Sequence, residues 1–191
     1  MRNRLRVASA AALILMFPIL GGCSNGSTSD PDETTTTTTT VAATPSEELP
    51  RSLSPIDITT IDVHDPDAVA EAAIAAMYTY LPRVDLNQNA AMLRAAPLLN
   101  EKMAAGAYNY DPPTGPGRTW DRWADSNTLV SAQAQVIPQQ RPPDDTFALR
   151  YVTVQQTTRT QYSTQKLAPI YLVVSLENTP DGWRVAQTLQ R

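Results

Sequence analysis

The chain has 191 residues, and its fifteen Lys and Arg residues against nineteen Asp and Glu residues give a formal net charge of −4. This acidic balance argues against binding to nucleic acid, which favours a basic stripe on the protein surface. The single cysteine excludes an internal disulfide, and the single histidine, His64, excludes a histidine-rich metal site.

Residues 1–22 have the pattern of a secretory signal peptide. Arg2, Arg4 and Arg6 precede an apolar stretch that ends at Leu20, and no acidic residue comes before Asp30. The stretch has roughly 14 residues, fewer than the ~20 that a transmembrane helix needs. A short membrane anchor or a buried helix is the alternative interpretation, but the charge asymmetry and the small residues at its end favour a signal that is removed.

Cys23 directly follows Leu20-Gly21-Gly22, and this arrangement resembles the signal of bacterial lipoproteins. The resemblance implies that the thiol of Cys23 receives a diacylglyceryl group, which carries fatty acyl chains such as palmitate, and that Cys23 becomes the first residue of the mature chain. It also implies an extracytoplasmic protein of the cell envelope, anchored to the cell membrane by lipid. Because two acyl chains hold a protein stably on a bilayer, the folded part need not touch lipid.

Removal of residues 1–22 makes the mature chain more acidic. Three arginines and no acid are lost, which leaves twelve basic against nineteen acidic residues and a net charge of −7. A negative protein is repelled by anionic lipid, so the net charge argues against electrostatic docking to the membrane.

Residues 23–56 are predicted to form a disordered tether that begins at the lipidated cysteine. The segment is rich in Ser, Thr and Pro, and Thr34–Thr40 is an unbroken run of seven threonines. Such a composition has too little apolar surface to offset the entropy of ordering. An O-glycosylated stalk and a bare flexible linker are both open interpretations.

Residues 57–191 have the length of one globular domain, with helices first and strands afterwards. Asp65 and Pro66 predict the start of a helix that runs through Leu81 and ends at Pro82. A second short helix is expected from Asn87 through Ala96. A third is expected after Pro97, from Leu98 to Ala105, with Gly106 at its C-terminus and a loop over residues 107–118.

Four antiparallel strands are predicted in the second half of the domain, at residues 128–137, 147–161, 170–177 and 183–189. In the first, Val130, Ala132, Ala134 and Val136 alternate with a largely polar set, which indicates one buried face. Residues 142–145 predict a turn, and residues 178–182, Asn-Thr-Pro-Asp-Gly, predict a hairpin. The fold class is therefore α+β.

The closing hairpin, Asp181-Gly182-Trp183-Arg184-Val185, and the order of helices before strands resemble the superfamily named after nuclear transport factor two. The layout is also similar to the periplasmic scaffold component of type IV secretion systems. The resemblance covers residues 61–191. It implies a cone in which three N-terminal helices pack on a curved antiparallel sheet of about four strands, often with a pocket, and it implies no particular chemistry.

Aromatic residues around the Pro- and Gly-rich loop are the candidate binding residues: Tyr108, Tyr110, Trp120 and Trp123. Exposed aromatic side chains on loops often mark binding surfaces. The alternative is that they cover the core at one end of the sheet.

Enzymes of the resembled superfamily that move protons need a carboxylate base that faces a tyrosine or an acid inside the cone. The candidate tyrosines are Tyr78, Tyr80, Tyr151 and Tyr171, and the candidate acids are Asp121 and Asp125. Because aspartates of this kind are mostly surface or capping residues, we expect no catalytic residue, no metal ligand and no cofactor.

Two further features have plain interpretations. His64 precedes the first helix in a polar segment, so a solvated side chain is expected. Residues 155–161 form a polar end of the second strand, for which a solvated extension and an edge open to strand addition are the alternatives.

The leading hypothesis is a non-enzymatic interaction module, an accessory of an envelope transport, secretion or conjugation assembly with an envelope protein as its partner. The alternative is a binder of a small apolar, lipid-like ligand, and an isomerase-like or hydrolytic enzyme is a remote third. The ligand is expected in an apolar cavity between the first helix and the sheet, so a core sealed by Met77, Tyr80, Val152 and Leu172 would refute this alternative. A cavity of roughly 300 Å³ or more with converging polar groups favours it.

Replacement of Cys23 tests the lipid anchor. The Cys23→Ala variant should leave the membrane fraction, because no acyl chain can then be attached. The measurement is sedimentation with membranes after a carbonate wash, and a variant that still sediments with them would place the anchor elsewhere.

Overall fold

The computed structural model of the protein describes residues 48–112 and 115–191, which belong to one unit of the chain, residues 43–191. The signal peptide, Cys23 and the tether up to residue 47 lie outside the described residues. Within residues 48–56, the backbone N–H of Ile56 donates to the carbonyl of Arg94 (3.0 Å), and Ile56 packs against the core.

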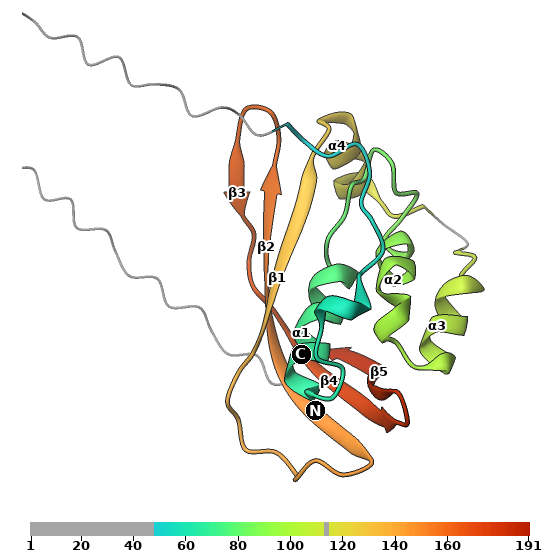
Figure 1. The fold of residues 1–191 in the computed structure, drawn as a ribbon. Helices are drawn as coiled ribbons and strands as arrows, with labels where there is room; N and C mark the ends of the chain where they lie inside the picture. The colour runs from blue at the N-terminus through green and yellow to red at the C-terminus, as the bar shows by residue number, and fades with distance from the viewer. Residues whose placement is uncertain (1–47, 113–114) are drawn as a thin grey trace, which may run out of the picture. The chain divides into compact units, whose positions relative to one another are not determined.

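The helices come first, as predicted, and then the strands (Figure 1). The helical elements are η1 (Ile58–Thr60), α1 (Pro66–Met77), α2 (Asn89–Ala95), η2 (Ala96–Leu98), α3 (Glu101–Tyr108) and α4 (Arg118–Asp125). The strands are β1 (Leu129–Val136), β2 (Phe147–Arg159), β3 (Thr164–Lys166), β4 (Ile170–Thr179) and β5 (Gly182–Gln190). The α+β class is confirmed, with α4 and β3 as elements that the sequence interpretation missed.

The sheet is antiparallel and open, with the order β1-β2-β4-β5, and β3 pairs with the end of β2. The predicted strand pairing and the hairpin between β4 and β5 are confirmed. Figure 1 shows α1 lying against the sheet, with α2 and α3 beyond it.

Helix α1 begins where the sequence predicted and ends one turn earlier. The side chain of Asp65 accepts from the N–H of Asp67 (2.9 Å), which caps the first turn. The helix stops at Met77 instead of Leu81. The reason is a contact distant in sequence: the N–H of Tyr80 donates to the carbonyl of Val130 (2.7 Å), and the N–H of Val130 donates to the carbonyl of Tyr80 (2.9 Å).

The third helix also differs from its prediction. It begins after Asn100, whose side chain accepts from the N–H of Met103 (2.9 Å), instead of after Pro97. Gly106 is internal to the helix, which continues to Tyr108. The predicted loop is correspondingly shorter, because helix packing outweighs the low helix propensity of one glycine.

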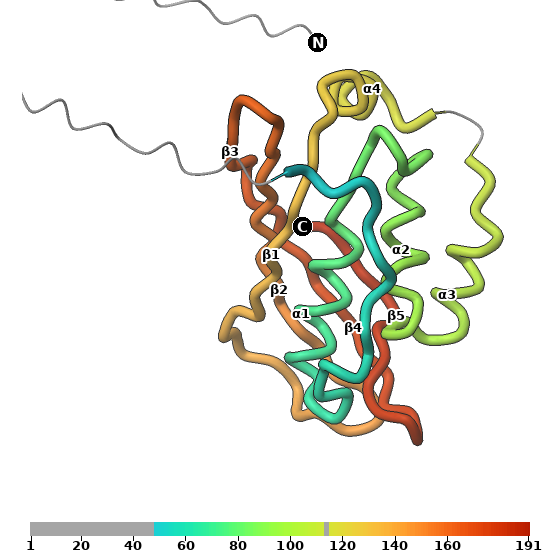
Figure 2. The backbone as a smooth tube through the Cα atoms, turned by 45° about the horizontal axis from the view of Figure 1, so that its top comes forward, coloured from blue at the N-terminus to red at the C-terminus, as the bar shows by residue number. Residues whose placement is uncertain are grey.

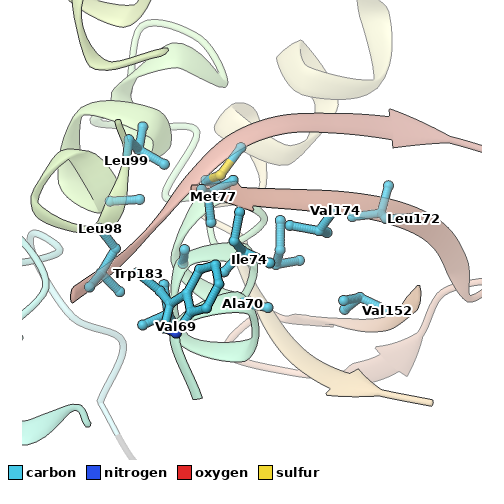
Figure 3. Packing of buried hydrophobic residues seen from close by; sticks show 14 of the residues in the cluster. Val69, Ala70, Ile74, Met77, Leu98, Leu99, Val152, Leu172, Val174 and Trp183 are labelled. Carbon is cyan, nitrogen blue, oxygen red and sulfur yellow. The ribbon is translucent and has the colours of Figure 1, made fainter. Parts of the chain in front are cut away.

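The core lies between α1 and the sheet (Figure 3). Val69, Ile74 and Met77 of α1 face Val152 of β2 and Val174 of β4, and all five are buried. Burial of a side chain of this size contributes on the order of 2 kcal/mol. The apolar face of α1 therefore accounts for the position of the helix on the sheet.

Arg150 lies on this buried face of β2 with only 1% of its surface exposed. Its guanidinium donates to Asp67 in the first turn of α1 and to both carboxylate oxygens of Asp144 (2.7 and 2.6 Å). The bond to Arg150 holds the pKa of Asp144 below its usual range. The buried charge is thus fully paired, and it joins α1 to the loop between β1 and β2.

Both edges of the sheet are covered by neighbouring segments. At β1, besides the Tyr80 bridge, the N–H of Ala132 donates to the hydroxyl of Thr79 (3.1 Å) and the N–H of Val136 donates to Glu71 (2.8 Å). At β5, the N–H of Asn100 donates to the carbonyl of Val185 (2.8 Å). Such cover protects an edge from pairing with other chains.

The polar end of β2 is not an edge. Residues 155–159 pair with β1 on one side, and residues 157–159 also pair with β3 on the other. The hypothesis of strand addition at this end is wrong for these residues, because the short strand β3, too brief to show a periodic pattern, occupies the position.

The hairpin between β4 and β5 depends on Gly182. Its φ is +100°, which side chains of L-residues rarely adopt. A Cβ atom at this position would lie 2.5 Å from the carbonyl oxygen of Val63, which also accepts from the N–H of Trp183 (2.7 Å). Gly182 therefore lets the hairpin approach the turn before α1.

Replacing two glycines by alanine should change stability in opposite directions. Gly182→Ala should destabilise the domain by about 1–2 kcal/mol or more, because of its left-handed backbone and the contact with Val63. Gly106→Ala should stabilise it by up to about 1 kcal/mol, because an added Cβ meets nothing within 4 Å in a helix interior. Urea unfolding measures both, and equal effects would contradict this account.

Candidate functional site

A pocket of about 450 Å³, partly open to solvent, lies where the end of α1 meets α2, α3 and the end of β5. We call it the tyrosine pocket. Its lining consists of Met77, Tyr78, Tyr80, Gln88, Asn89, Met92, Gly106, Tyr110, Thr188 and Gln190. None of these residues is acidic, basic or a histidine.

The tyrosines at the end of α1 are held by the strands. The bridge to Val130 fixes the backbone of Tyr80, and the side-chain amide of Gln156 on β2 donates to the carbonyl of Tyr78 (2.8 Å). Arg94 of α2 donates to the carbonyl of Thr79 between them (2.9 Å). The two side chains are therefore placed by contacts to three other elements, which pre-organises the pocket.

Both tyrosines are phenols whose ionisation is suppressed. Burial raises the pKa of Tyr80 well above its ordinary value, and the neighbouring phenol of Tyr78 raises it further. The charge of Arg94 and a hydrogen bond with Gln156 act in the opposite direction and are weaker. Burial also raises the pKa of Tyr78. Near neutral pH the pocket therefore offers neutral hydroxyl groups.

Helices α2 and α3 form the other wall. The side-chain amide of Asn89 donates to the carbonyl of Ala107 (2.7 Å), which ties the start of α2 to the end of α3. Gly106 of α3 and Tyr110, which follows the end of this helix, both border the pocket. The absence of a side chain at Gly106 leaves room on this wall.

The four candidate aromatic residues do not form one surface. Trp120 is only 4% exposed, and its ring packs against Tyr80 with centroids 5.3 Å apart. Trp123 is partly buried beside them. Tyr108 and Tyr110 are exposed, and of the four only Tyr110 lines the tyrosine pocket. Helix α4 turns Trp120 inward, which the short segment after the loop did not reveal.

The proposed combination of tyrosines and acids is not assembled. Tyr78 and Tyr80 reach the pocket, but Tyr151 and Tyr171 lie on the opposite face of the sheet, where Arg191 stacks over the ring of Tyr151 (5.4 Å). The reason is the twofold alternation of strands, which buries Val152 and Leu172 instead.

The two candidate acids, Asp121 and Asp125, are exposed on α4, where they border a surface hollow with Arg118 and Arg122. They do not line the tyrosine pocket, because the buried face of the short α4 is taken by Trp120. His64 is exposed, as its position predicted, and its N–H donates to Asp62 (2.9 Å).

The cavity predicted between the first helix and the sheet is not found, because side chains of α1 and the strands fill this part of the core, and the hollow lies at its end. Met77, Tyr80, Val152 and Leu172 are all buried, yet Met77 and Tyr80 also form part of the pocket wall. The polar members of the wall, among them Gln88, Asn89, Thr188 and Gln190, were not foreseen. They come from separate parts of the chain, and no local pattern marks them.

No group of three or more His, Cys, Asp or Glu side chains within residues 48–112 and 115–191 is arranged to hold a metal ion. Over the same residues, no helix has the length and apolarity that crossing a membrane requires.

Comparison with protein-family models, with curated proteins and with solved structures finds no match to this chain.

Proposed function

We propose that this chain is an exported protein, held on the outer side of the cell membrane through diacylglyceryl-Cys23, whose domain binds a small uncharged ligand in the tyrosine pocket. The observation that carries the proposal is a pocket of about 450 Å³ lined by neutral polar and apolar side chains. Pockets of this volume, with a few placed polar groups, are typical of small-molecule sites.

The fold fits this proposal. A helix on one face of an antiparallel sheet, with a hollow at the end of the shared core, is the arrangement of the cone-shaped superfamily that the sequence resembles. We propose membership of that superfamily on these grounds, with α4 and β3 as additions to the expected pattern.

The chemistry of the wall favours a neutral ligand with an apolar body. The side chains of Met77 and Met92 and the ring of Tyr110 present apolar surface, while the hydroxyls of Tyr78 and Tyr80 offer hydrogen bonds. Transfer of a charged ligand from water into the pocket would carry a large desolvation penalty, because no side chain of the wall supplies a counter-charge. The pocket lining has no carboxylate or imidazole, and the raised pKa of Tyr78 and of Tyr80 makes these phenols poor bases near neutral pH, so we propose binding instead of turnover.

Methionine methyl groups allow a direct test. Of the folded part's Met77, Met92 and Met103, the first two line the pocket and the third does not. With methyl-¹³C-methionine, octanamide should shift the signals of Met77 and Met92 and leave that of Met103. Octanoate, of the same length but charged, should bind on the order of tenfold more weakly, because burial of its carboxylate is uncompensated.

Filling the pocket provides the control for folding. Gly106→Leu should abolish the octanamide shifts without loss of stability, because leucine favours a helix and the position is sterically open. Ala105→Leu, at the adjacent exposed position, is the matched control and should bind normally. Unchanged shifts in Gly106→Leu, or shifts at Met103 as large as at Met77, would refute the proposed site.

A second candidate function is supported by the outer face of the sheet. Phe147, Tyr171 and Leu189 are exposed there, and Tyr151, Val173 and Leu189 are neighbours in one row across β2, β4 and β5. In this row Leu189 is exposed and Tyr151 and Val173 are half-buried, and a contiguous apolar row on a sheet face can serve as a docking surface for a protein. They favour the accessory module of an envelope transport, secretion or conjugation assembly, with a protein as the partner.

Cross-linking in intact cells distinguishes this candidate. A photoreactive residue in place of Tyr171 should capture one defined envelope protein from such an assembly. The same residue in place of Tyr108, an exposed tyrosine of α3, should not capture it. No adduct at Tyr171, or the same adducts at both positions, would remove the protein-partner function.

A further inference from the structure

One end of the domain combines the start of the described chain with loops from three other regions. Figures 1 and 2 both show residue 48 beside the hairpin of β2 and β3, with α4 at the same end. A hollow of about 540 Å³ lies here, bordered among others by Arg51, Arg83, Val84 and Gln161. We call this region the tether end, because the segment from Cys23 joins the domain here.

The tether end carries the most exposed apolar side chains. Tyr162 at the tip of the hairpin is 90% exposed and Leu86 in the loop after α1 is 87% exposed, the two highest values among the large hydrophobic residues described. Val84, which borders the hollow, is more than half exposed. A single exposed apolar side chain is ordinary on a protein surface, so what distinguishes this end is that Leu86 and Val84 lie in one loop and Val84 borders the same hollow as Gln161, the neighbour of Tyr162.

Basic residues surround these apolar side chains. Arg51, Arg83 and Lys166 are exposed, and none of them forms an ion pair with another described residue. Of the residues that border the hollow, only Glu48 is acidic. Helix α4 at the same end carries Arg118 and Arg122 beside Asp121 and Asp125, so it adds no net charge. Basic residues therefore outnumber acidic ones at the tether end, although the mature chain is negative.

Acidic residues gather at the opposite end. The turn before α1 contacts the β4–β5 hairpin through Val63 and Trp183, and Arg150 joins α1 to the β1–β2 loop. The acidic residues of these segments are Asp62, Asp65, Asp67, Asp144, Asp145 and Asp181. These six aspartates outnumber the basic residues paired with them, Arg141 and Arg150. The two ends thus differ in their balance of charge, which the net charge of the chain does not describe.

We propose that the tether end docks on the surface of an anionic phospholipid bilayer. The proposal rests on the lipid anchor at Cys23, which brings this end toward the bilayer. Tyr162 and Leu86 would enter the interface between headgroups and acyl chains, where Tyr is favoured and apolar side chains are buried. Arg51, Arg83 and Lys166 would lie at the phosphates, while the acidic end would face away from the membrane. The net charge predicts that the domain avoids anionic lipid. The proposal is instead that the domain binds anionic lipid in one orientation, through its basic end.

The test uses the acylated chain in vesicles of equal parts phosphatidylcholine and phosphatidylglycerol. Because Cys23 is acylated and is the only natural cysteine, an introduced thiol can be labelled uniquely with an environment-sensitive fluorophore. Leu86→Cys and Tyr162→Cys report the tether end. Phe147→Cys, an exposed apolar residue at the other end of β2, is the control.

Nitroxide lipids in the bilayer should quench the labels at Leu86 and Tyr162 and leave the label at Phe147. Arg51→Gln or Arg83→Gln should each lower the ratio of docked to undocked protein about fivefold, and pure phosphatidylcholine should abolish docking. Equal quenching at Phe147 and Leu86, or quenching that ignores lipid charge and both substitutions, would overturn the proposal.

Flotation with the vesicles separates this proposal from the anchor. A chain that floats without quenching at Leu86 retains its anchor and refutes docking. A chain that floats with pure phosphatidylcholine vesicles is anchored through Cys23. A chain that floats only with the anionic vesicles lacks the anchor but supports docking, and a chain that floats with neither refutes both.

Discussion

Fixation of helix α1 at both ends is the constraint on which the rest of the structure depends. At the start of α1, Asp67 accepts a hydrogen bond from the guanidinium of Arg150, which lies on the buried face of β2. At its end, the backbone of Tyr80 pairs with Val130 of β1. A helix held in this way cannot slide along the sheet, so its apolar face meets Val152 in one register, and the turn that follows it becomes a wall of the tyrosine pocket.

The same constraint separates what could be predicted from what could not. The start of α1 depends on neighbours in sequence, because Asp65 caps the N–H of Asp67, and the Asp-Pro pair signals it directly. Its end depends on Val130, fifty residues later, and helix propensity alone extends the helix to Leu81. Strands and the hairpin at Gly182 carry local alternation and turn signals, and they were predicted within a few residues.

The candidate site was harder to predict, because its wall is assembled from distant segments. Tyr78 and Tyr80 were among the residues considered, since they lie on the strongest predicted helix. For Trp120 the sequence left a binding surface and a cover over the core as alternatives, because no pattern in eight residues shows which side of α4 is buried. Amide side chains such as Asn89 and Gln190 have no distinctive spacing, so only the fold brings them together.

The placement of charge links the pocket to the surface. The most buried cations, Arg94 and Arg150, are each paired with carboxylates that also fix backbone or loops: Asp85, which binds Arg94 (2.7 Å), accepts from the N–H of Leu81 (2.8 Å). Removing either partner would leave a buried charge uncompensated, which is strongly unfavourable. The buried charges therefore stabilise the fold, and the lining of the tyrosine pocket beside Arg94 contains no charged side chain. The remaining charges described lie at the surface, outside the pocket and the core.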